Sequence, residues 1–217
     1  MLTTTHYCLL CLLSVRSYSA YELVQQMARS VGHVWPRADS NLYADLKRLA
    51  AEGLATAERT SVGRRRRTVY TITDGGRSEL AGWLAAPGGG PSFECEALLK
   101  LGFAPHTSKA AALAQVTVLA EHAGERLALG RRLATEHLAS GGPEPDRLHI
   151  NAVMWRFLWE QHQAIARWAA WAADEIGGWP DTATSPTLRE RGRTALRTAL
   201  AADSTGQLTG PQTRRDT

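Results

Sequence analysis

Four consecutive arginines, residues 64–67, are the most concentrated chemical feature of the sequence. Like charges on adjacent residues repel one another, so such a run is costly unless solvent screens it or a polyanion binds it. Taken alone, the run is compatible with a solvated loop, with RNA binding or with contact to DNA phosphates. Its neighbours in the sequence are needed to choose between these three interpretations.

A second group of polar and basic residues precedes the arginines at steps of three or four, which is the spacing of one helix face. The side chains in the middle of this face are short and those at its end are basic, so the helix can approach a nucleic-acid groove closely. Ser40 and Asn41 would offer hydrogen-bonding groups to base edges, and the cations would lie near phosphates. The residues of this face are Arg37, Ser40, Asn41, Ala44, Lys47, Arg48 and Ala51.

Both groups lie on elements that the sequence predicts. Leu42, Leu46, Leu49 and Ala50 recur at helical spacing and give residues 37–52 a buried stripe opposite the polar face. Residues 55–60 and 67–72 are expected to be strands, because the second contains the β-formers Val69 and Tyr70. Ser61, Val62 and Gly63 supply the bend between them. A helix followed by a hairpin with a cationic tip is the layout of a winged helix-turn-helix, which favours DNA contact for the arginine run.

Further helices complete this unit. Residues 3–14 are almost uniformly apolar and should form a buried helix. Cys8 and Cys11 have the spacing of zinc ligands, but no second pair follows, so core residues are the better interpretation. Ser19 is a plausible N-cap for a second helix that Gly32 ends, and Asp39 can cap the helix after it. Thr73 and Asp74 open a fourth helix that runs to Ala86.

Composition and charge agree with this arrangement. The 217 residues carry a net charge of +4, and all of the excess lies in residues 1–86, where eleven Lys and Arg oppose seven Asp and Glu. Three cysteines cannot form a disulfide framework. The N-terminus lacks the basic region of a signal peptide, and no segment is long and apolar enough for a membrane span. A cytoplasmic protein is therefore expected.

The remaining chain divides at a break of prolines and glycines, residues 87–91. We expect a winged helix-turn-helix domain in residues 1–86, a helical dimerisation and effector domain in residues 92–178, and a flexible tail in residues 179–217. The tail would contain one short helix near residues 188–202 and be disordered from Asp203. The helix predicted for residues 145–176 has two apolar faces and four tryptophans. One face would pack on its own chain and the other on a partner subunit, where large aromatic residues are favoured. The candidate dimerisation residues are Leu158, Ile165, Trp168 and Ala172.

The motifs of the first 86 residues resemble those of the PadR family of bacterial transcriptional regulators. The resemblance rests on Trp35-Pro36, Leu42-Tyr43, Leu46, Arg48-Leu49 and Gly53-Leu54, followed by Gly63, Arg67, Tyr70, Ile72-Thr73 and Gly76-Arg77. Ala38 stands where the family often has a Ser or Thr cap, and Ser40-Asn41 replaces a frequent Gly-Thr/Ser pair. The operator sequence is therefore not expected to carry over from a relative.

The resemblance implies a homodimeric repressor, sometimes an activator, with its wing on a pseudo-palindromic DNA operator and C-terminal helices for dimerisation. It also assigns Tyr43 to phosphate contact and Tyr70 to support of the wing. A small-molecule effector, for example an aromatic one, is expected near Trp155, Trp159 and His162, with plain core residues as the simpler interpretation of each. The full set of expected DNA-binding residues is Arg37, Ser40, Asn41, Tyr43, Lys47, Arg48, Arg64, Arg65, Arg66 and Arg67.

Two other functions fit parts of the pattern. A MarR-like regulator also has a winged helix, but such proteins usually place dimerisation helices at both chain ends. A protein-interaction module could use the same fold to bind another protein rather than DNA. No enzymatic activity, cofactor or metal site is expected, because catalytic and nucleotide-binding motifs are missing and the seven histidines are scattered without ligand spacing.

Overall fold

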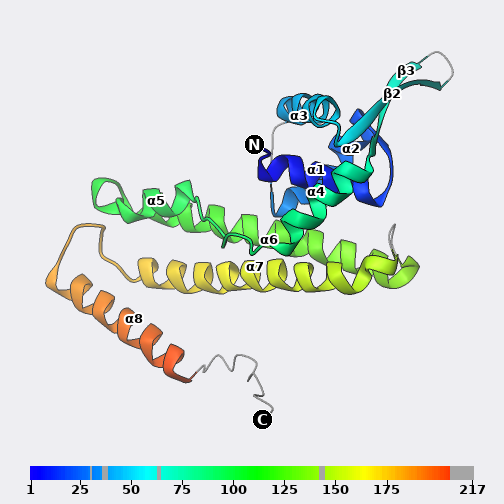
Figure 1. Cartoon of the computed structure of the whole chain (residues 1–217). Coiled ribbons are helices and arrows are strands. Elements are labelled where there is room, and N and C mark those ends of the chain that lie inside the picture. Colours follow the sequence, from blue (N-terminus) through cyan, green and yellow to red (C-terminus); the bar gives the residue numbers. More distant parts are fainter. Residues whose placement is uncertain (30, 36–38, 63–64, 142–144, 206–217) are drawn as a thin grey trace, which may run out of the picture. The chain divides into compact units, whose positions relative to one another are not determined.

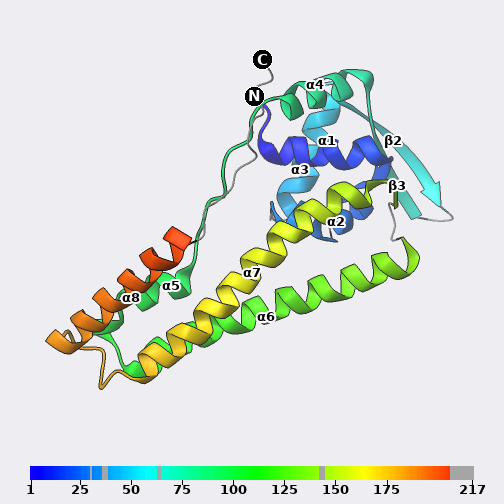
Figure 2. The same ribbon diagram turned by 90° about the horizontal axis from the view of Figure 1, so that it is seen from below.

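The chain folds as two units, Met1–Pro91 and Ser92–Thr217. Figure 1 shows the computed structural model, which describes residues 1–29, 31–35, 39–62, 65–141 and 145–205. The first unit combines short helices with a small sheet, and the second contains only helices (Figures 1 and 2). The structure is therefore mainly α, with a β-hairpin in the N-terminal unit.

The N-terminal unit, here called the winged unit, contains three helices, a β-hairpin and a fourth helix. Its strands form one antiparallel sheet in the order β1-β3-β2. Ala55 lies opposite Ile72 and Val62 opposite Arg65, and the hairpin projects from the helices of this unit (Figure 1). This is the winged helix-turn-helix arrangement. Its elements are α1 (Thr4–Val15), β1 (Tyr18–Ser19), α2 (Ala20–Arg29), the 3-10 turn η1 (Val31–His33), α3 (Asp39–Ala51), β2 (Ala55–Val62), β3 (Arg65–Ile72) and α4 (Asp74–Ala85).

The winged unit has a leucine-rich core. Helix α1 is apolar on nearly all sides because α2, α3, α4 and β3 all pack around it. Leu42, Leu46 and Leu49 of α3 are buried in this core, as their spacing predicted. Cys8 is buried in the same core, and Cys11 packs against it. The core thus fixes the position of α3 and of the hairpin base.

Two glycines allow the close junction between α3, the hairpin and α4. Gly53 has a φ of 74°, a left-handed conformation that lets the chain leave α3 and enter β2. Gly76 packs so closely on Leu54 that an added Cβ would lie 2.1 Å from the carbonyl oxygen of Leu54. Thr73 joins both sides of this junction. Its hydroxyl donates to the Gly53 carbonyl at 2.7 Å and accepts from the Gly76 amide at 3.0 Å.

The structure corrects three details of the sequence prediction in this unit. A two-residue strand, β1, pairs with β3, so the sheet has three strands rather than two. Ser61 and Val62 lie in β2 rather than in the bend, because the hairpin pairs two residues further on each side. Val31 belongs to a separate 3-10 turn, since α2 already ends at Arg29.

The C-terminal unit, here called the helical unit, is built on two long helices, α6 and α7, that pack against each other. Ser108 caps α6 by accepting from the Ala111 amide at 3.1 Å, and Gly141 ends it with a φ of 75°. Helix α5 packs on α6, and α8 follows α7 (Figure 2). Its elements are α5 (Glu96–Gly102), η2 (Ala104–His106), α6 (Lys109–Ser140), η3 (Pro145–Arg147), α7 (Leu148–Gly177) and α8 (Pro186–Thr205).

The core of the helical unit is small and lies where α6 meets the C-terminal half of α7. Ala112 and Val116 of α6 are buried there against Ala169, Ala172 and Ile176 of α7. Lys109 closes this end by donating from Nζ to the carbonyls of Gly177 and Trp179, each at 2.6 Å. The rest of the two helices leaves large apolar side chains exposed.

Helix α8 is longer than the sequence suggested. It spans Pro186–Thr205, so Asp203, where the disordered tail was expected to begin, is still helical. The prediction of disorder beyond it falls on residues 206–217, outside the described residues. In the described ranges, no helix has both the length and the apolar character that crossing a membrane requires.

Candidate nucleic-acid interface

Helix α3 turns a polar face to solvent because its leucines are anchored in the core. Asn41, Tyr43 and Lys47 are exposed on this face, as are Ala44 and Ala51. Tyr43 retains 42% of its accessible surface although it is a large aromatic residue. An exposed helix of this kind, with small side chains between polar ones, can enter a major groove.

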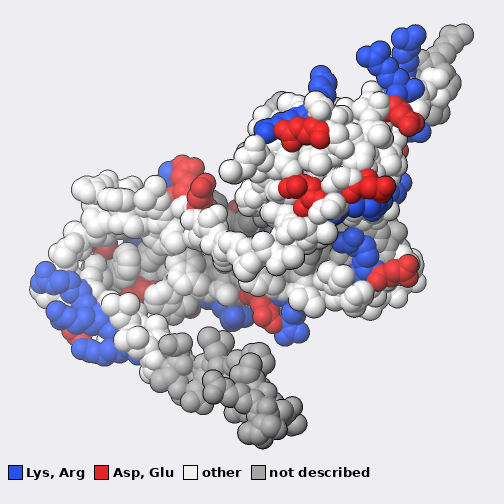
Figure 3. Space-filling view, in the orientation of Figure 1, with Lys and Arg blue, Asp and Glu red and all other residues white. Residues whose placement is uncertain are grey.

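The hairpin carries the second part of the surface. Arg66 and Arg67 lie on β3 with exposed side chains, and Thr60 and Ser61 of β2 lie opposite them. Tyr70 is only 6% exposed, and burial raises the pKa of its hydroxyl. Tyr70 thus belongs to the core and supports the hairpin from beneath. Figure 3 shows that Lys and Arg side chains gather along this arm.

The helix face and the hairpin meet in one concave surface. A cavity of about 590 Å³ lies between α2, α3 and β3. Lys47 of α3 and Arg66 and Arg67 of β3 contribute three cations to its wall, against the single carboxylate of Glu22. The fold therefore brings together residues that are about twenty positions apart in the sequence. The lining, here called the cationic wall, is Ser19, Ala20, Tyr21, Glu22, Tyr43, Lys47, Arg66, Arg67, Thr68 and Tyr70.

Residues at the start of α2 belong to the cationic wall and were not among the predicted site residues. Tyr21 is 60% exposed there. Glu22 accepts from the Ser19 amide at 2.8 Å, while its own amide donates to the Ser19 hydroxyl at 3.3 Å. This reciprocal capping box confirms Ser19 as the N-cap. Hydrogen bonding to Ser19 is the main cause of the lowered pKa of Glu22, and Arg67, 3.7 Å away, contributes further.

Glu22 therefore links the beginning of α2 to the hairpin. Its carboxylate is fixed by the helix N-terminus and can hold the Arg67 guanidinium toward the cavity. The Ser-x-x-Glu spacing could have revealed the capping box from the sequence. The contact with Arg67 could not have been found there, because it depends on how β3 packs beside α2.

Arg48 differs from the other predicted cations. Its Nε donates to Glu52 at 2.8 Å, and its Nη2 donates to the carbonyl of Met1 at 3.1 Å. The hydrogen bond from Arg48 is the largest cause of the lowered pKa of Glu52. Arg48 is exposed but does not line the cationic wall. Its charge is partly balanced by Glu52, so it is a weaker candidate for phosphate contact than Lys47.

Four predicted DNA contacts have side chains outside the structural description. Arg37 and Arg64 lie outside the described residues altogether. Ser40 belongs to α3 and Arg65 to β3, but only their backbone positions are described. The structure therefore brings together Tyr43, Lys47, Arg66 and Arg67 of the predicted set, with Asn41 exposed on the same helix.

The predicted effector residues lie on α7 and face α6. Trp155 meets the ring of His137 edge-on, with centroids 4.5 Å apart. Trp159 packs on Gly130, where an added Cβ would lie 3.0 Å from the indole ring. His162 lies 5.9 Å from His122, ring to ring. The three side chains thus line the seam between two helices of the same chain.

His162 is half-buried and lies near two other basic side chains, His122 and Arg126. Its Nδ1 is buried and has no hydrogen-bond partner among the described residues. Burial lowers the pKa of His162, and His122 and Arg126 lower it further. The neutral imidazole is therefore favoured at neutral pH.

The predicted dimerisation residues lie at different depths on α7. Leu158 and Ile165 are half-buried. Trp168 packs against the small core of the helical unit, and Ala172 is buried inside it with 3% exposure. The side chain of Ala172 is thus already covered by its own chain. Exposed apolar residues at the other end of α7, such as Val153 and Phe157, were not in the predicted set.

Comparison with known proteins extends this description. Residues 9–82 match the "Transcriptional regulator PadR-like family". The chain is 34% identical over 79 residues to the negative transcriptional regulator PadR of Bacillus subtilis, covering 36% of this chain and 43% of that protein. It is 38% identical over 72 residues to a probable transcriptional regulator of Mycobacterium tuberculosis, covering 32% of this chain and 37% of that protein. The chain thus spans less than half the length of these curated relatives.

Solved structures are similar over a larger part of the chain. Bacillus subtilis PadR in complex with operator DNA superposes with a TM-score of 0.69 at 23% identity, covering 80% of this chain and 99% of that one. The same protein in complex with p-coumaric acid gives a TM-score of 0.64 at 22% identity, over 81% and 99%. At these identities the likeness establishes the fold, including the C-terminal helices. Residues 9–82 therefore form a PadR-like regulator domain, and the fold of the chain is that of PadR-like winged-helix regulators.

Proposed function

We propose that this protein is a sequence-specific DNA-binding transcriptional regulator in which α3 enters the major groove and the hairpin contacts the adjacent backbone. The observation that carries the proposal is the cationic wall, where Lys47, Arg66 and Arg67 converge beside Tyr43. Three cations in one concavity favour a polyanion, and a polar helix face beside them favours a duplex groove. The complex of Bacillus subtilis PadR with operator DNA supports the same assignment.

We further propose that the protein acts as a homodimer that represses transcription and is released by a small molecule. Large apolar residues remain exposed on the helical unit, which supports burial against a second copy. The description of the Bacillus subtilis relative as a negative regulator supports repression. The complex of that relative with p-coumaric acid supports an aromatic effector, for which the seam near Trp155, Trp159 and His162 is the proposed location.

The first test measures DNA affinity as a function of salt. Each cation placed on a phosphate releases about one counterion, so affinity should fall steeply as salt rises. Replacing Arg66 and Arg67 by alanine should weaken binding to every duplex and reduce the salt slope by roughly one per arginine. Replacing Arg193 and Arg197 of α8 removes the same charge elsewhere and should leave the slope unchanged. Equal slopes for both double variants would exclude the hairpin from the interface.

The second test examines base reading. Asn41→Ala should relax preference at particular base pairs, at a cost of about 1–3 kcal/mol for a good contact. Selection of bound fragments from random duplexes should yield half-sites about one helical turn, roughly 34 Å, apart if two copies bind together. A uniform loss over all sites would contradict base reading by Asn41. A stable complex with another protein and no salt-sensitive duplex binding would instead support the interaction-module alternative.

A further inference from the structure

The helical unit contains an open cavity that the proposed function does not use. It has a volume of about 920 Å³ and lies between α7 and α8. This volume is within the range of sites that hold drug-sized molecules, roughly 300–1,000 Å³. The seam formed by Trp155, Trp159 and His162 contributes no residue to its lining. The cavity is thus separate from the effector location proposed above.

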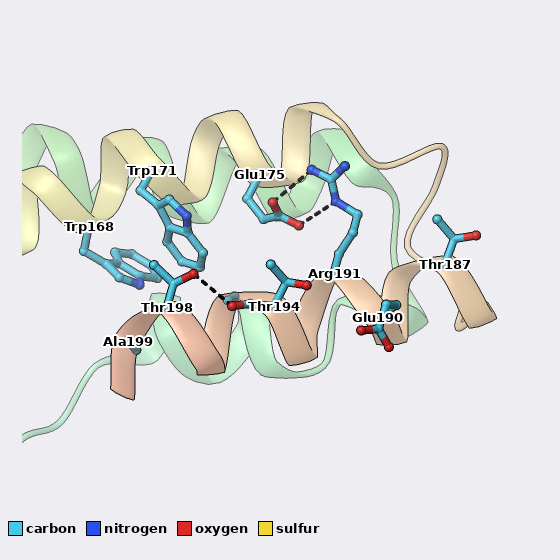
Figure 4. Close-up of a pocket in the computed structure, with 10 residues that line it drawn as sticks. Trp168, Trp171, Glu175, Thr187, Glu190, Arg191, Thr194, Thr198 and Ala199 are labelled. Carbon is cyan, nitrogen blue, oxygen red and sulfur yellow. Dashed lines mark hydrogen bonds and ion pairs between the residues drawn. The ribbon is translucent and has the colours of Figure 1, made fainter. Parts of the chain in front are cut away.

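The two walls of the cavity differ in character. Helix α7 contributes the indoles of Trp168 and Trp171, both of which point toward α8 in Figure 4. Trp168 is partly buried against the small core, while Trp171 keeps 50% of its surface exposed. The opposite wall carries short side chains, which leave space in front of the indoles. It consists of Thr194, Ala195, Thr198 and Ala199 of α8.

An ion pair connects the two walls at one end. Arg191 of α8 donates to both carboxylate oxygens of Glu175 on α7, from Nε at 2.8 Å and from Nη2 at 2.9 Å (Figure 4). Glu175 also accepts from the indole nitrogen of Trp179 at 3.1 Å. The guanidinium lies against Gly178, where an added Cβ would approach Nη2 to 3.0 Å. This anchor fixes α8 beside the end of α7, and the short side chains beyond it leave space in front of the tryptophans.

The charged side chains around the cavity are already neutralised by ion pairs within the protein. Glu175 is paired with Arg191, and Glu190 is paired with Arg193 and Arg197, each at 3.0 Å. A charged ligand would therefore have to compete with an existing ion pair. A flat uncharged ring system would instead stack on the indole faces and reach the threonine hydroxyls with a carbonyl or hydroxyl group. An apolar helix of a second copy would instead bury Glu190 together with its ion pairs to Arg193 and Arg197, at a cost in desolvation.

We propose that the cavity between α7 and α8 binds a planar, uncharged aromatic molecule that stacks on Trp168 and Trp171. The ligand class follows from the two indoles, the short side chains opposite them and the matched charges. The inference goes beyond the proposed function, because this cavity shares no lining residue with the proposed effector location. Binding to it can also be measured without DNA.

The test uses Nile red, a neutral planar dye that brightens in apolar surroundings, titrated with the full chain. We expect saturable binding of one dye per chain. Trp171→Ala should weaken it by roughly tenfold or more, since a large aromatic wall is lost. Ala199→Phe should abolish it by filling the cavity. Leu200→Phe adds the same bulk on the neighbouring residue, which is 72% exposed and does not line the cavity, and should bind as the wild type does.

Several outcomes would overturn the proposal. One is that the wild type does not bind the dye saturably. Another is that the wild type, Trp171→Ala and Ala199→Phe chains bind it with equal affinity. An equal loss in Leu200→Phe would show that the dye responds to α8 in general. A dye affinity that falls as protein concentration rises would assign the cavity to a second copy. Circular dichroism shows whether each variant keeps its helices, and Ala199→Phe tests the cavity independently if Trp171→Ala does not fold.

Discussion

The two units of this chain differ in how much apolar surface they bury within the single chain. The winged unit surrounds one apolar helix, α1, with other elements and buries large leucines completely, among them Leu9, Leu13 and Leu46. The core cluster of the helical unit contains, among the described residues, six buried ones, four of which are alanines. A core of small residues removes little apolar surface from water, so it contributes little to stability. The winged unit is therefore expected to be stable alone, whereas the helical unit needs a partner.

The exposed apolar residues support this contrast. In the helical unit they are large and numerous, and several follow one another along α7. A monomer rarely exposes so many large apolar residues together, and an interface between copies would bury them. Outside α8 and the cavity that Trp171 lines, they are Phe93, Leu98, Leu99, Phe103, Val118, Leu138, Ile150, Val153, Met154 and Phe157.

The largest expected effect comes from the core of the winged unit. Leu46 has no exposed surface, so Leu46→Ala should lower the free energy of unfolding by about 2–5 kcal/mol. Val116→Ala in the helical unit removes two side-chain carbons, whereas Leu46→Ala removes three, so it should cost less, roughly 1–2 kcal/mol at about 0.8 kcal/mol per carbon. Urea unfolding followed by circular dichroism measures both. A loss for Val116→Ala equal to that for Leu46→Ala would remove the contrast between the two cores.

The next effect tests the helical unit as a dimerisation surface. Phe157 is 57% exposed in the single chain, so Phe157→Asp should be tolerated by the monomer but should place a charge in a dimer interface twice. We expect the dimer dissociation constant to rise by roughly a hundredfold or more. Sedimentation equilibrium measures it. Gln163→Glu adds a charge at an exposed polar position of the same helix and should leave the dimer intact. A wild-type chain that sediments as a monomer would refute the role of α7.

A third prediction compares thiols in the two units. Burial raises the pKa of Cys8 to about 11, with a smaller contribution from Cys11. Only the thiolate reacts with alkylating agents, so at pH 8 Cys8 should react with iodoacetamide roughly tenfold or more slowly than half-exposed Cys95. Mass spectrometry of peptides after timed quenching gives both rates. Equal rates would show that the winged core opens readily, contrary to the stability assigned to it.

Much of the winged unit could be predicted from the sequence because its patterns are local. The spacing of Leu42, Leu46 and Leu49 defines the buried face of α3, and the exposed face follows from it. Strand β1 was missed because two residues, Tyr18 and Ser19, show no alternation. Tyr21 was missed as a wall residue for a different reason. Its place beside Arg66 and Arg67 depends on tertiary structure, which helical spacing does not report.

The helical unit was harder to predict because periodicity does not identify which partner covers a face. The two apolar faces of α7 were recognised, but the sequence could not show that Trp155 and Trp159 face α6 of the same chain. Ala172 was assigned to a partner, and it is buried against the chain's own core. Helix α8 was underestimated because its threonines and Gly192 disfavour helix, whereas the Glu175–Arg191 pair holds it in place.

The smallest expected effect concerns that pair, which attaches α8 to the rest of the helical unit. Hydrogen bonds from Arg191, and then from Trp179, lower the pKa of Glu175 below its ordinary value. A lowered pKa means that the ionised carboxylate stabilises the attachment above the ordinary glutamate pKa, about 4.3, and that this contribution is lost as pH falls through the lowered value. Deuterium exchange of α8 amides, corrected for the intrinsic pH dependence, should therefore accelerate only in acid.

Charge removal at neutral pH separates this ion pair from general effects of acid. Glu175→Gln should speed exchange in α8 at pH 7, by a modest factor because exposed ion pairs contribute little. Glu190→Gln removes a carboxylate that pairs only with arginines of α8 itself among its described ion pairs, so it should leave the attachment to α7 unchanged. Equal exchange in the two variants would mean that apolar contacts with Trp168 and Trp171, rather than the ion pair, keep α8 in place. In that case Trp171→Ala should release α8 at neutral pH.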